Sequence, residues 1–254
     1  MIHDVQLNQG HYTWPELRAV ARAAETAGYN TLWIVDHLAG EVMAAKSMPE
    51  CFTLLGALAE ATSTIRLGVL VANVGTRHPG VLANAAATVQ NLSGDRFTLG
   101  LGAGPSPKSS FASELHALDM AIPASMTERH RRVEETLDLL EAMWSPTRDE
   151  RYATFPMPSS KIPVVIGVNS ITLAQVASRR ADGVNVRASH ERRAEILAAA
   201  QPSDERPFIS SVWDYFDPQF LSRREHVDDQ LAGEGVNRVV WFVRGKADPR
   251  TVAS

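Results

Sequence analysis

Thr31-Leu32-Trp33-Ile34-Val35-Asp36-His37 is an apolar run that ends in an acid and an imidazole. The part 31–35 has the length and composition of a buried β-strand. In parallel α/β proteins, ligands and reacting groups gather beyond the carboxyl ends of the strands. Asp36 and His37 are therefore placed to act on a bound molecule, although an acid at such a position can also simply cap the next turn.

The rest of the chain repeats this alternation of strand and helix. Apolar runs predict strands at 5–7, 31–35, 65–71, 97–101, 164–166, 183–186, 208–212 and 238–243. Helical periodicity and end signals predict helices at 13–28, 49–61, 78–92, 127–144, 172–179, 191–200 and 218–231, with a short terminal helix. Such an alternation predicts one α/β domain over 1–254, a (β/α)8 TIM-type barrel, with an open doubly wound sheet as the alternative.

The composition is that of an ordinary globular protein, with 44% hydrophobic and 21% charged residues. A net charge of -4 gives no electrostatic basis for nucleic-acid or membrane partners. The single cysteine, Cys51, excludes an internal disulfide and suits a reducing compartment. The first residues lack a signal-peptide pattern, so we expect a cytoplasmic protein. The eight histidines show no metal-ligand spacing, and we expect no metal site.

Two segments at the predicted barrel mouth favour ligand binding. The connection 103–125 shows no firm periodicity and follows the fourth strand, where a binding loop or lid is expected. Before it, the glycine-rich stretch 100–104 does not have the spacing of a dinucleotide fingerprint. Its glycines can serve only to shape the strand, or can let a planar ligand approach the backbone, and we favour the second interpretation.

Two further strand ends offer polar groups. Gly167, Val168, Asn169 and Ser170 lead into a helix whose first amides could bind a phosphate, although an ordinary capped helix has the same pattern. After the third strand, Asn73 could face a ligand, and Arg77 could bind phosphate or form a structural ion pair.

The chain resembles the bacterial luciferase-like monooxygenase superfamily, and within it the deazaflavin-dependent oxidoreductases. The resemblance is carried, in order, by Glu25-x-x-Gly28-Tyr29-x-x-Leu32-Trp33-x-x-Asp36-His37-Leu38, Ile65-Arg66-Leu67-Gly68, Arg77-His78-Pro79, Leu92-Ser93-Gly94-x-Arg96-Phe97-x-Leu99-Gly100-Leu101-Gly102-Ala103-Gly104, Pro163-Val164-Val165-Ile166-Gly167 and Ala181-Asp182-Gly183. Each motif is modest alone, but their order and spacing are specific.

The resemblance implies a TIM-like barrel that binds coenzyme F-420 or FMN at its mouth. Asp36 and His37 would lie beside the ring system, with His37 handling a proton or orienting substrate. The family often has a non-proline cis peptide at the end of strand three, which here would join Leu70 and Val71. By the same resemblance, Asn73, Ala103, Gly104 and residues 167–170 would contact the cofactor, and the protein would form a homodimer.

Three functional hypotheses follow. The first is F-420-dependent hydride transfer to or from a small organic substrate. The second is an FMN-dependent monooxygenase that works with a reductase. The third is a non-catalytic flavin-binding barrel, because Val168-Asn169-Ser170 stands where relatives commonly carry glycines.

Overall fold

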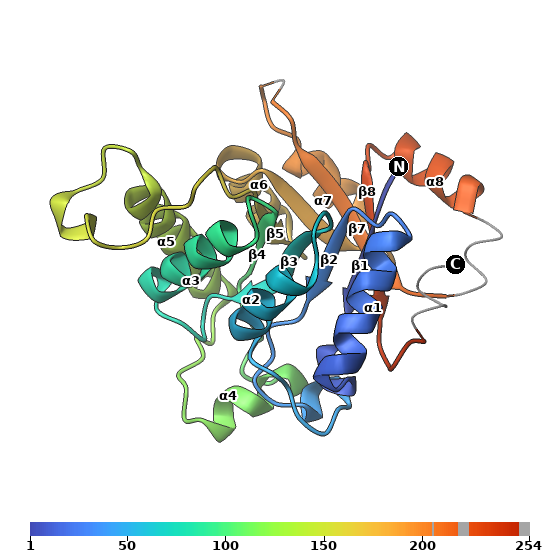
Figure 1. The fold of residues 1–254 in the computed structure, drawn as a ribbon. Helices are drawn as coiled ribbons and strands as arrows, with labels where there is room; N and C mark the ends of the chain where they lie inside the picture. Colours follow the sequence, from blue (N-terminus) through green and yellow to red (C-terminus); the bar gives the residue numbers. More distant parts are fainter. Residues whose placement is uncertain (205, 218–223, 249–254) are drawn as a thin grey trace.

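Eight parallel strands close into a barrel in the computed structural model, which describes residues 1–204, 206–217 and 224–248. The strands are β1 (Ile2–Leu7), β2 (Thr31–Ile34), β3 (Arg66–Asn73), β4 (Phe97–Gly102), β5 (Val164–Gly167), β6 (Gly183–Arg187), β7 (Ile209–Tyr215) and β8 (Arg238–Val243). Each strand pairs with its neighbour in sequence, and β8 pairs with β1. The predicted TIM-type barrel is confirmed (Figure 1).

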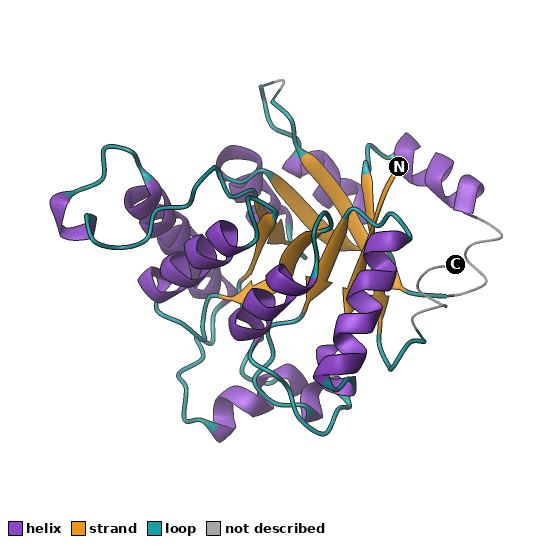
Figure 2. Cartoon of the chain, viewed as in Figure 1, coloured by secondary structure: helices purple, strands orange, loops and turns teal. Residues whose placement is uncertain are grey.

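Helices surround the strands (Figure 2). They are α1 (Trp14–Thr26), α2 (Cys51–Ala61), α3 (Pro79–Leu92), α4 (Ser113–Ala117), α5 (Met126–Trp144), α6 (Ile171–Arg180), α7 (Arg193–Ala200) and α8 (Arg224–Gly233). α1 shows why the ends were predictable, because Thr13 and Glu16 form a capping box and Gly28, at a φ of 81°, ends the helical segment. No helix in the described part of the chain is long and apolar enough to cross a lipid bilayer.

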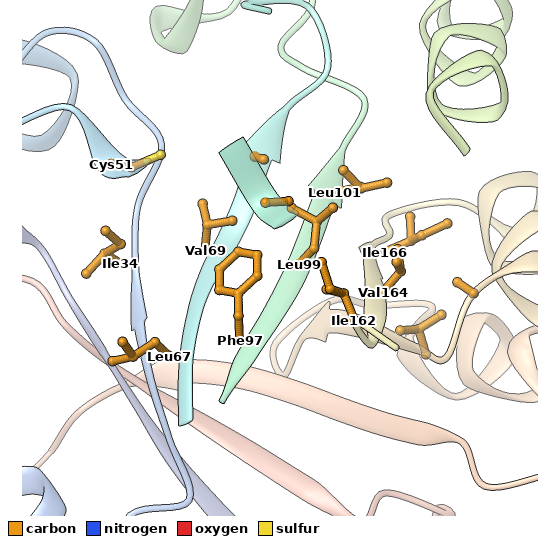
Figure 3. Close-up of a cluster of buried hydrophobic side chains, with 14 of the residues drawn as sticks. Ile34, Cys51, Leu67, Val69, Phe97, Leu99, Leu101, Ile162, Val164 and Ile166 are labelled. Atoms are coloured by element: carbon orange, nitrogen blue, oxygen red, sulfur yellow. The ribbon is translucent and has the colours of Figure 1, made fainter. Parts of the chain in front are cut away.

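Two apolar clusters hold the barrel. The larger cluster packs the outer faces of the strands against the helices, and Figure 3 shows part of it, where Val69 of β3, Leu99 of β4 and Ile166 of β5 are drawn. The smaller cluster contains only strand residues, Trp33, Leu70 and Val240, and fills the barrel interior. A methyl group at Gly68 would lie 2.3 Å from the Trp33 ring, so glycine at this position makes room for the indole.

Several predicted boundaries were wrong for identifiable reasons. Ser125, not Thr127, caps α5, since its hydroxyl accepts a hydrogen bond from Glu128 N at 3.1 Å. The connection 103–125 contains a 3-10 turn, η3 (Ser110–Ala112), and the short helix α4, which periodicity cannot reveal in so few residues. β7 extends to Tyr215, three residues beyond the prediction. Residues 218–223 of the predicted helix 218–231, and the terminal helix over 249–254, lie outside the described residues.

The end of β3 is irregular as the resemblance implied. The Leu70–Val71 peptide bond is cis, and the pairing of β3 with β4 shifts register between Val69 and Ala72. This prediction is confirmed. The irregularity lies at the carboxyl ends of the strands, where the cavity described next opens.

Candidate functional site

A cavity of about 710 Å³ opens at the carboxyl ends of the strands, and all eight strands or their following residues line it. Its size is that of a site for a cofactor or drug-sized molecule. Ten of the predicted residues line it: Asp36, His37, Leu70, Val71, Asn73, Ala103, Gly104, Gly167, Val168 and Asn169. Ser170 does not, and its hydroxyl instead caps α6 by accepting a hydrogen bond from Leu173 N at 3.3 Å.

His37 is paired with a carboxylate from a distant segment. Its Nδ1 lies 2.9 Å from Oε1 of Glu114 in α4, and the Phe111 ring stacks on the imidazole with centroids 5.8 Å apart. Figure 1 shows α4 below the barrel, away from the helices that pack on the strands. The β4–α5 connection therefore covers the mouth as predicted, and it supplies a partner for His37 that the sequence analysis missed.

The Glu114 carboxylate is fixed on both oxygens. Oε2 accepts hydrogen bonds from the backbone amides of Leu38 at 2.7 Å and Ala39 at 2.9 Å. Burial alone would raise the pKa of Glu114, but the hydrogen bonds from His37 and these amides outweigh it and lower the pKa below its ordinary value. A deprotonated Glu114 requires Nδ1 of His37 to be the donor, which leaves Nε2 available in the cavity wall.

Asp36 is committed to a buried network. Oδ2 accepts from Asn73 N at 3.0 Å and from Nη1 of Arg77 at 2.5 Å, and Oδ1 accepts from the Cys51 thiol at 3.1 Å. Arg77 also binds Glu50, so it forms the structural ion pair that was one of its two predicted roles. Both Asp36 oxygens are engaged in these hydrogen bonds, so neither is left to act on a substrate. The geometry therefore favours a positioning role for this side chain over its predicted catalytic role.

The same network contains the only grouping with metal-ligand chemistry among the described residues. Donor atoms of Asp36, Glu50 and Cys51 lie within 4.8 Å of one another. The Arg77 guanidinium binds both carboxylates and supplies the positive charge at this point. Burial and the nearby Asp36 charge raise the pKa of the Cys51 thiol, which disfavours the thiolate that would ligate a metal.

The glycines of β4 and β5 make room for β3 side chains. A methyl group at Gly102 would lie 2.3 Å from Cγ2 of Val71, and one at Gly167 would lie 2.9 Å from its Cγ1. A methyl group at Gly104, where φ is 76°, would meet Oδ1 of Asn73 at 2.7 Å. These glycines therefore make room for Val71 and Asn73, and Gly102, Ala103 and Gly104 also line the cavity, so the approach of a planar ligand to this stretch stays a prediction.

The corner between α5 and α6 brings basic and polar side chains to the cavity wall. Arg129 and His130 of α5 line it together with exposed Asn169, just before the first turn of α6. Arg129 donates to the carbonyls of Pro123 and Ala124 at 3.0 and 3.1 Å and has no carboxylate partner in the part of the chain that the structure describes. Burial and the Arg129 charge lower the pKa of His130, which favours a neutral ring.

Comparison with known proteins agrees with this architecture. Residues 2–205 match the profile of the luciferase-like monooxygenase family. The chain belongs to this family. The predicted family is thus confirmed.

Curated relatives within the luciferase-like family include enzymes of two kinds. An F-420-dependent glucose-6-phosphate dehydrogenase from Nakamurella multipartita is 32% identical over 178 residues, which cover 66% of this chain and 50% of the relative. A 4-hydroxyprotoasukamycin monooxygenase from Streptomyces nodosus subsp. asukaensis is 30% identical over 177 residues, covering 65% of this chain and 44% of the relative. The chain thus spans about half the length of these relatives.

Solved structures of similar fold cover nearly the whole chain. An F-420-dependent secondary alcohol dehydrogenase superposes with a TM-score of 0.77 at 13% identity, over 100% of this chain and 97% of that one. The coenzyme F-420-dependent tetrahydromethanopterin reductase from Methanopyrus kandleri gives a TM-score of 0.71 at 15% identity, over 99% and 96%. At these identities the likeness shows the shared barrel fold.

Proposed function

We propose that this chain is an F-420-dependent oxidoreductase that transfers hydride to or from a small organic substrate. The observation that carries the proposal is the His37–Glu114 pair at 2.9 Å in the wall of a cofactor-sized cavity, in a chain of the luciferase-like family. The relative named as an F-420-dependent dehydrogenase supports the choice of cofactor.

The residues of the cavity fit a planar cofactor with an anionic tail. Asn8 Oδ1 is buried without a hydrogen-bond partner, so the wall retains an acceptor for a ring N–H. Asn185 supplies a further amide group in the same wall. For the tail, Arg129 offers a positive charge and the first turn of α6, behind Asn169, offers backbone amides. When bound, the deazaflavin would supply hydride transfer at its C5 atom.

The His37–Glu114 pair would move the proton that accompanies the hydride. Glu114 holds the Nδ1–H tautomer, so Nε2 can accept the hydroxyl proton when an alcohol is oxidised and return it when a carbonyl is reduced. Glu114 would also stabilise the imidazolium formed in the first direction. Phe111, stacked on the ring, would limit its rotation.

Fluorescence titration of the purified chain with F-420 and, separately, with FMN tests this proposal. We expect saturable binding of F-420 at micromolar or lower Kd and weaker binding of FMN. The matched variant Arg129→Gln should weaken the binding of F-420 more than the binding of the deazaflavin chromophore without its tail, because the substitution removes one positive charge near the proposed position of the cofactor's phosphate. Failure to bind F-420 would contradict the proposal.

An FMN-dependent monooxygenase is the second candidate. The relative from Streptomyces nodosus, which is named as a monooxygenase, favours it at 30% identity. Preference for FMN in the titration would select this function. Binding of neither cofactor would contradict both candidates.

A further inference from the structure

The β6–β8 side of the mouth carries two guanidinium groups that have no acidic partner among the described residues. Arg187 ends β6 and Arg244 follows β8, and both approach the ring of Tyr215 at the end of β7. The guanidinium carbon of Arg244 lies 3.6 Å from the ring centroid, and that of Arg187 lies 5.7 Å from it. Among the described residues, neither side chain forms an ion pair or donates a hydrogen bond.

Arg244 is held in place although it is exposed. Its carbonyl accepts a hydrogen bond from Nδ2 of buried Asn8 at 2.9 Å, and the same amide group donates to Met43 O at 2.8 Å. The guanidinium is stacked on the Tyr215 ring, an arrangement that favours one orientation of a flexible side chain. The Arg244 guanidinium therefore presents its five N–H donors at the rim of the cavity. Because the stacking already orders this side chain, binding a ligand would cost less conformational entropy.

The cavity wall beside Arg244 is aromatic. Trp213 lies against Tyr215 with ring centroids 5.6 Å apart and against Phe242 at 6.3 Å, and all three rings line the cavity. Within the described part of the chain, no carboxylate of the cavity pairs with Arg244, since Glu114 pairs with His37, Asp36 pairs with Arg77, and Glu41 forms no ion pair. Arg244, which has no acidic partner in the described ranges, thus lies next to an apolar surface lined by aromatic rings.

We propose that Arg244 forms a subsite for the anionic group of the substrate, which is a carboxylate or phosphate ester carried on an apolar, planar body. A planar guanidinium binds either anion through paired hydrogen bonds, and the aromatic wall receives the apolar part. This inference rests on the proposed function, because it assigns a substrate class to the same cavity.

Calorimetric titration of the chain without cofactor tests the subsite with three probes. Phenyl phosphate carries both features, glucose 6-phosphate keeps the phosphate on a hydroxylated body, and benzyl alcohol keeps the ring without the charge. We expect phenyl phosphate to bind most tightly. Arg244→Gln should weaken it about tenfold and leave benzyl alcohol unchanged, because only the charge-assisted hydrogen bonds are lost. Arg18→Gln, at an exposed arginine on α1, is the matched control and should bind like the wild type.

The outcomes separate this inference from the proposed function. Equal affinity of Arg244→Gln and the wild type for phenyl phosphate overturns the subsite, and tighter binding of glucose 6-phosphate overturns its apolar half. If Arg244→Gln instead loses affinity for F-420 or FMN but not for phenyl phosphate, Arg244 holds the cofactor's own phosphate and the inference is wrong. If no cofactor binds the wild type but the probes behave as expected, the proposed function fails and the subsite stands.

Discussion

Glu114 is the residue on which the chemistry of the mouth depends, and its charge can be tested through stability. Replacement by Gln removes a buried carboxylate that accepts from His37, Leu38 and Ala39. We expect Glu114→Gln to lower the free energy of unfolding by about 1–3 kcal/mol at pH 7, because hydrogen bonds to a charged group are lost. Urea denaturation of both proteins measures this difference.

The pH dependence follows from the sign of the Glu114 shift. Its pKa in the folded chain is lowered from the ordinary 4.5, so its stabilising contribution is complete above pH 4.5 and is lost as the pH falls through the lowered value. The stability difference between wild type and Glu114→Gln should therefore shrink below pH 4.5. A difference that stays constant down to acid unfolding would show that the charge of Glu114 contributes nothing.

Single residues also show where prediction from sequence stops. His37 was predictable because it directly follows a strand, and strand ends meet at one face of a barrel. Glu114 lies 77 positions away in a short helix with no periodic signal, so only the folded chain brings it to His37. Asp36 had the same local signal as His37, yet its role depends on Arg77 and Cys51, whose approach no local pattern specifies.

At the scale of elements, Arg77 ties the end of β2 to the start of α2. The Asp36 side chain is 1% exposed and that of Arg77 14%, so their ion pair is largely buried. Arg77→Met leaves the Asp36 charge with only an amide and a thiol, and we expect a loss of about 3–5 kcal/mol in the free energy of unfolding. Combining it with Asp36→Asn should restore part of this loss, because the uncompensated charge is removed.

Chemical denaturation of the two single variants and the double variant measures that coupling. Glu50→Gln is the matched control, since the Glu50 side chain is 45% exposed and contacts the same guanidinium. We expect it to have a smaller effect than Arg77→Met. A double variant at least as unstable as the sum of the two single variants would contradict the buried-pair account.

Elements with strong periodicity were predicted well, and those defined by contacts were not. The strands at 31–35 and 97–101 are rich in large apolar residues, and both were located to within one residue. β7 was predicted too short because Trp213, Asp214 and Tyr215 do not form an apolar run. Trp213 and Tyr215 line the cavity and are not buried in the core, so the hydrophobic pattern ended before the strand did, and the aromatic wall was missed.

For the whole molecule, the barrel was predictable because the hydrophobic periodicity of the sequence reveals the alternation of strands and helices. The closure of the barrel, in contrast, depends on particular contacts. β1 must pair with β8, more than 230 residues away, and Asp4 at this seam is fully buried. Its carboxylate accepts from Arg238 of β8 at 3.0 Å, from Trp33 Nε1 of β2 at 2.9 Å and from Thr31 N at 3.1 Å. One side chain thus links the first, second and last strands.

Asp4→Ala should therefore destabilise the whole barrel. Arg238, 12% exposed, would keep only neutral acceptors, and the Trp33 indole would lose its partner, so we expect the free energy of unfolding to fall by about 3–5 kcal/mol. Asp4→Asn keeps an acceptor of the same shape and should lower the free energy of unfolding by less, which separates the loss of charge from the loss of packing.

Differential scanning calorimetry of both variants measures the effect. Glu135→Gln, which breaks an exposed pair with Arg131 in the middle of α5, should leave the midpoint unchanged. Wild-type midpoints for both Asp4 variants would mean that strand pairing alone closes the barrel, without the charge at its seam.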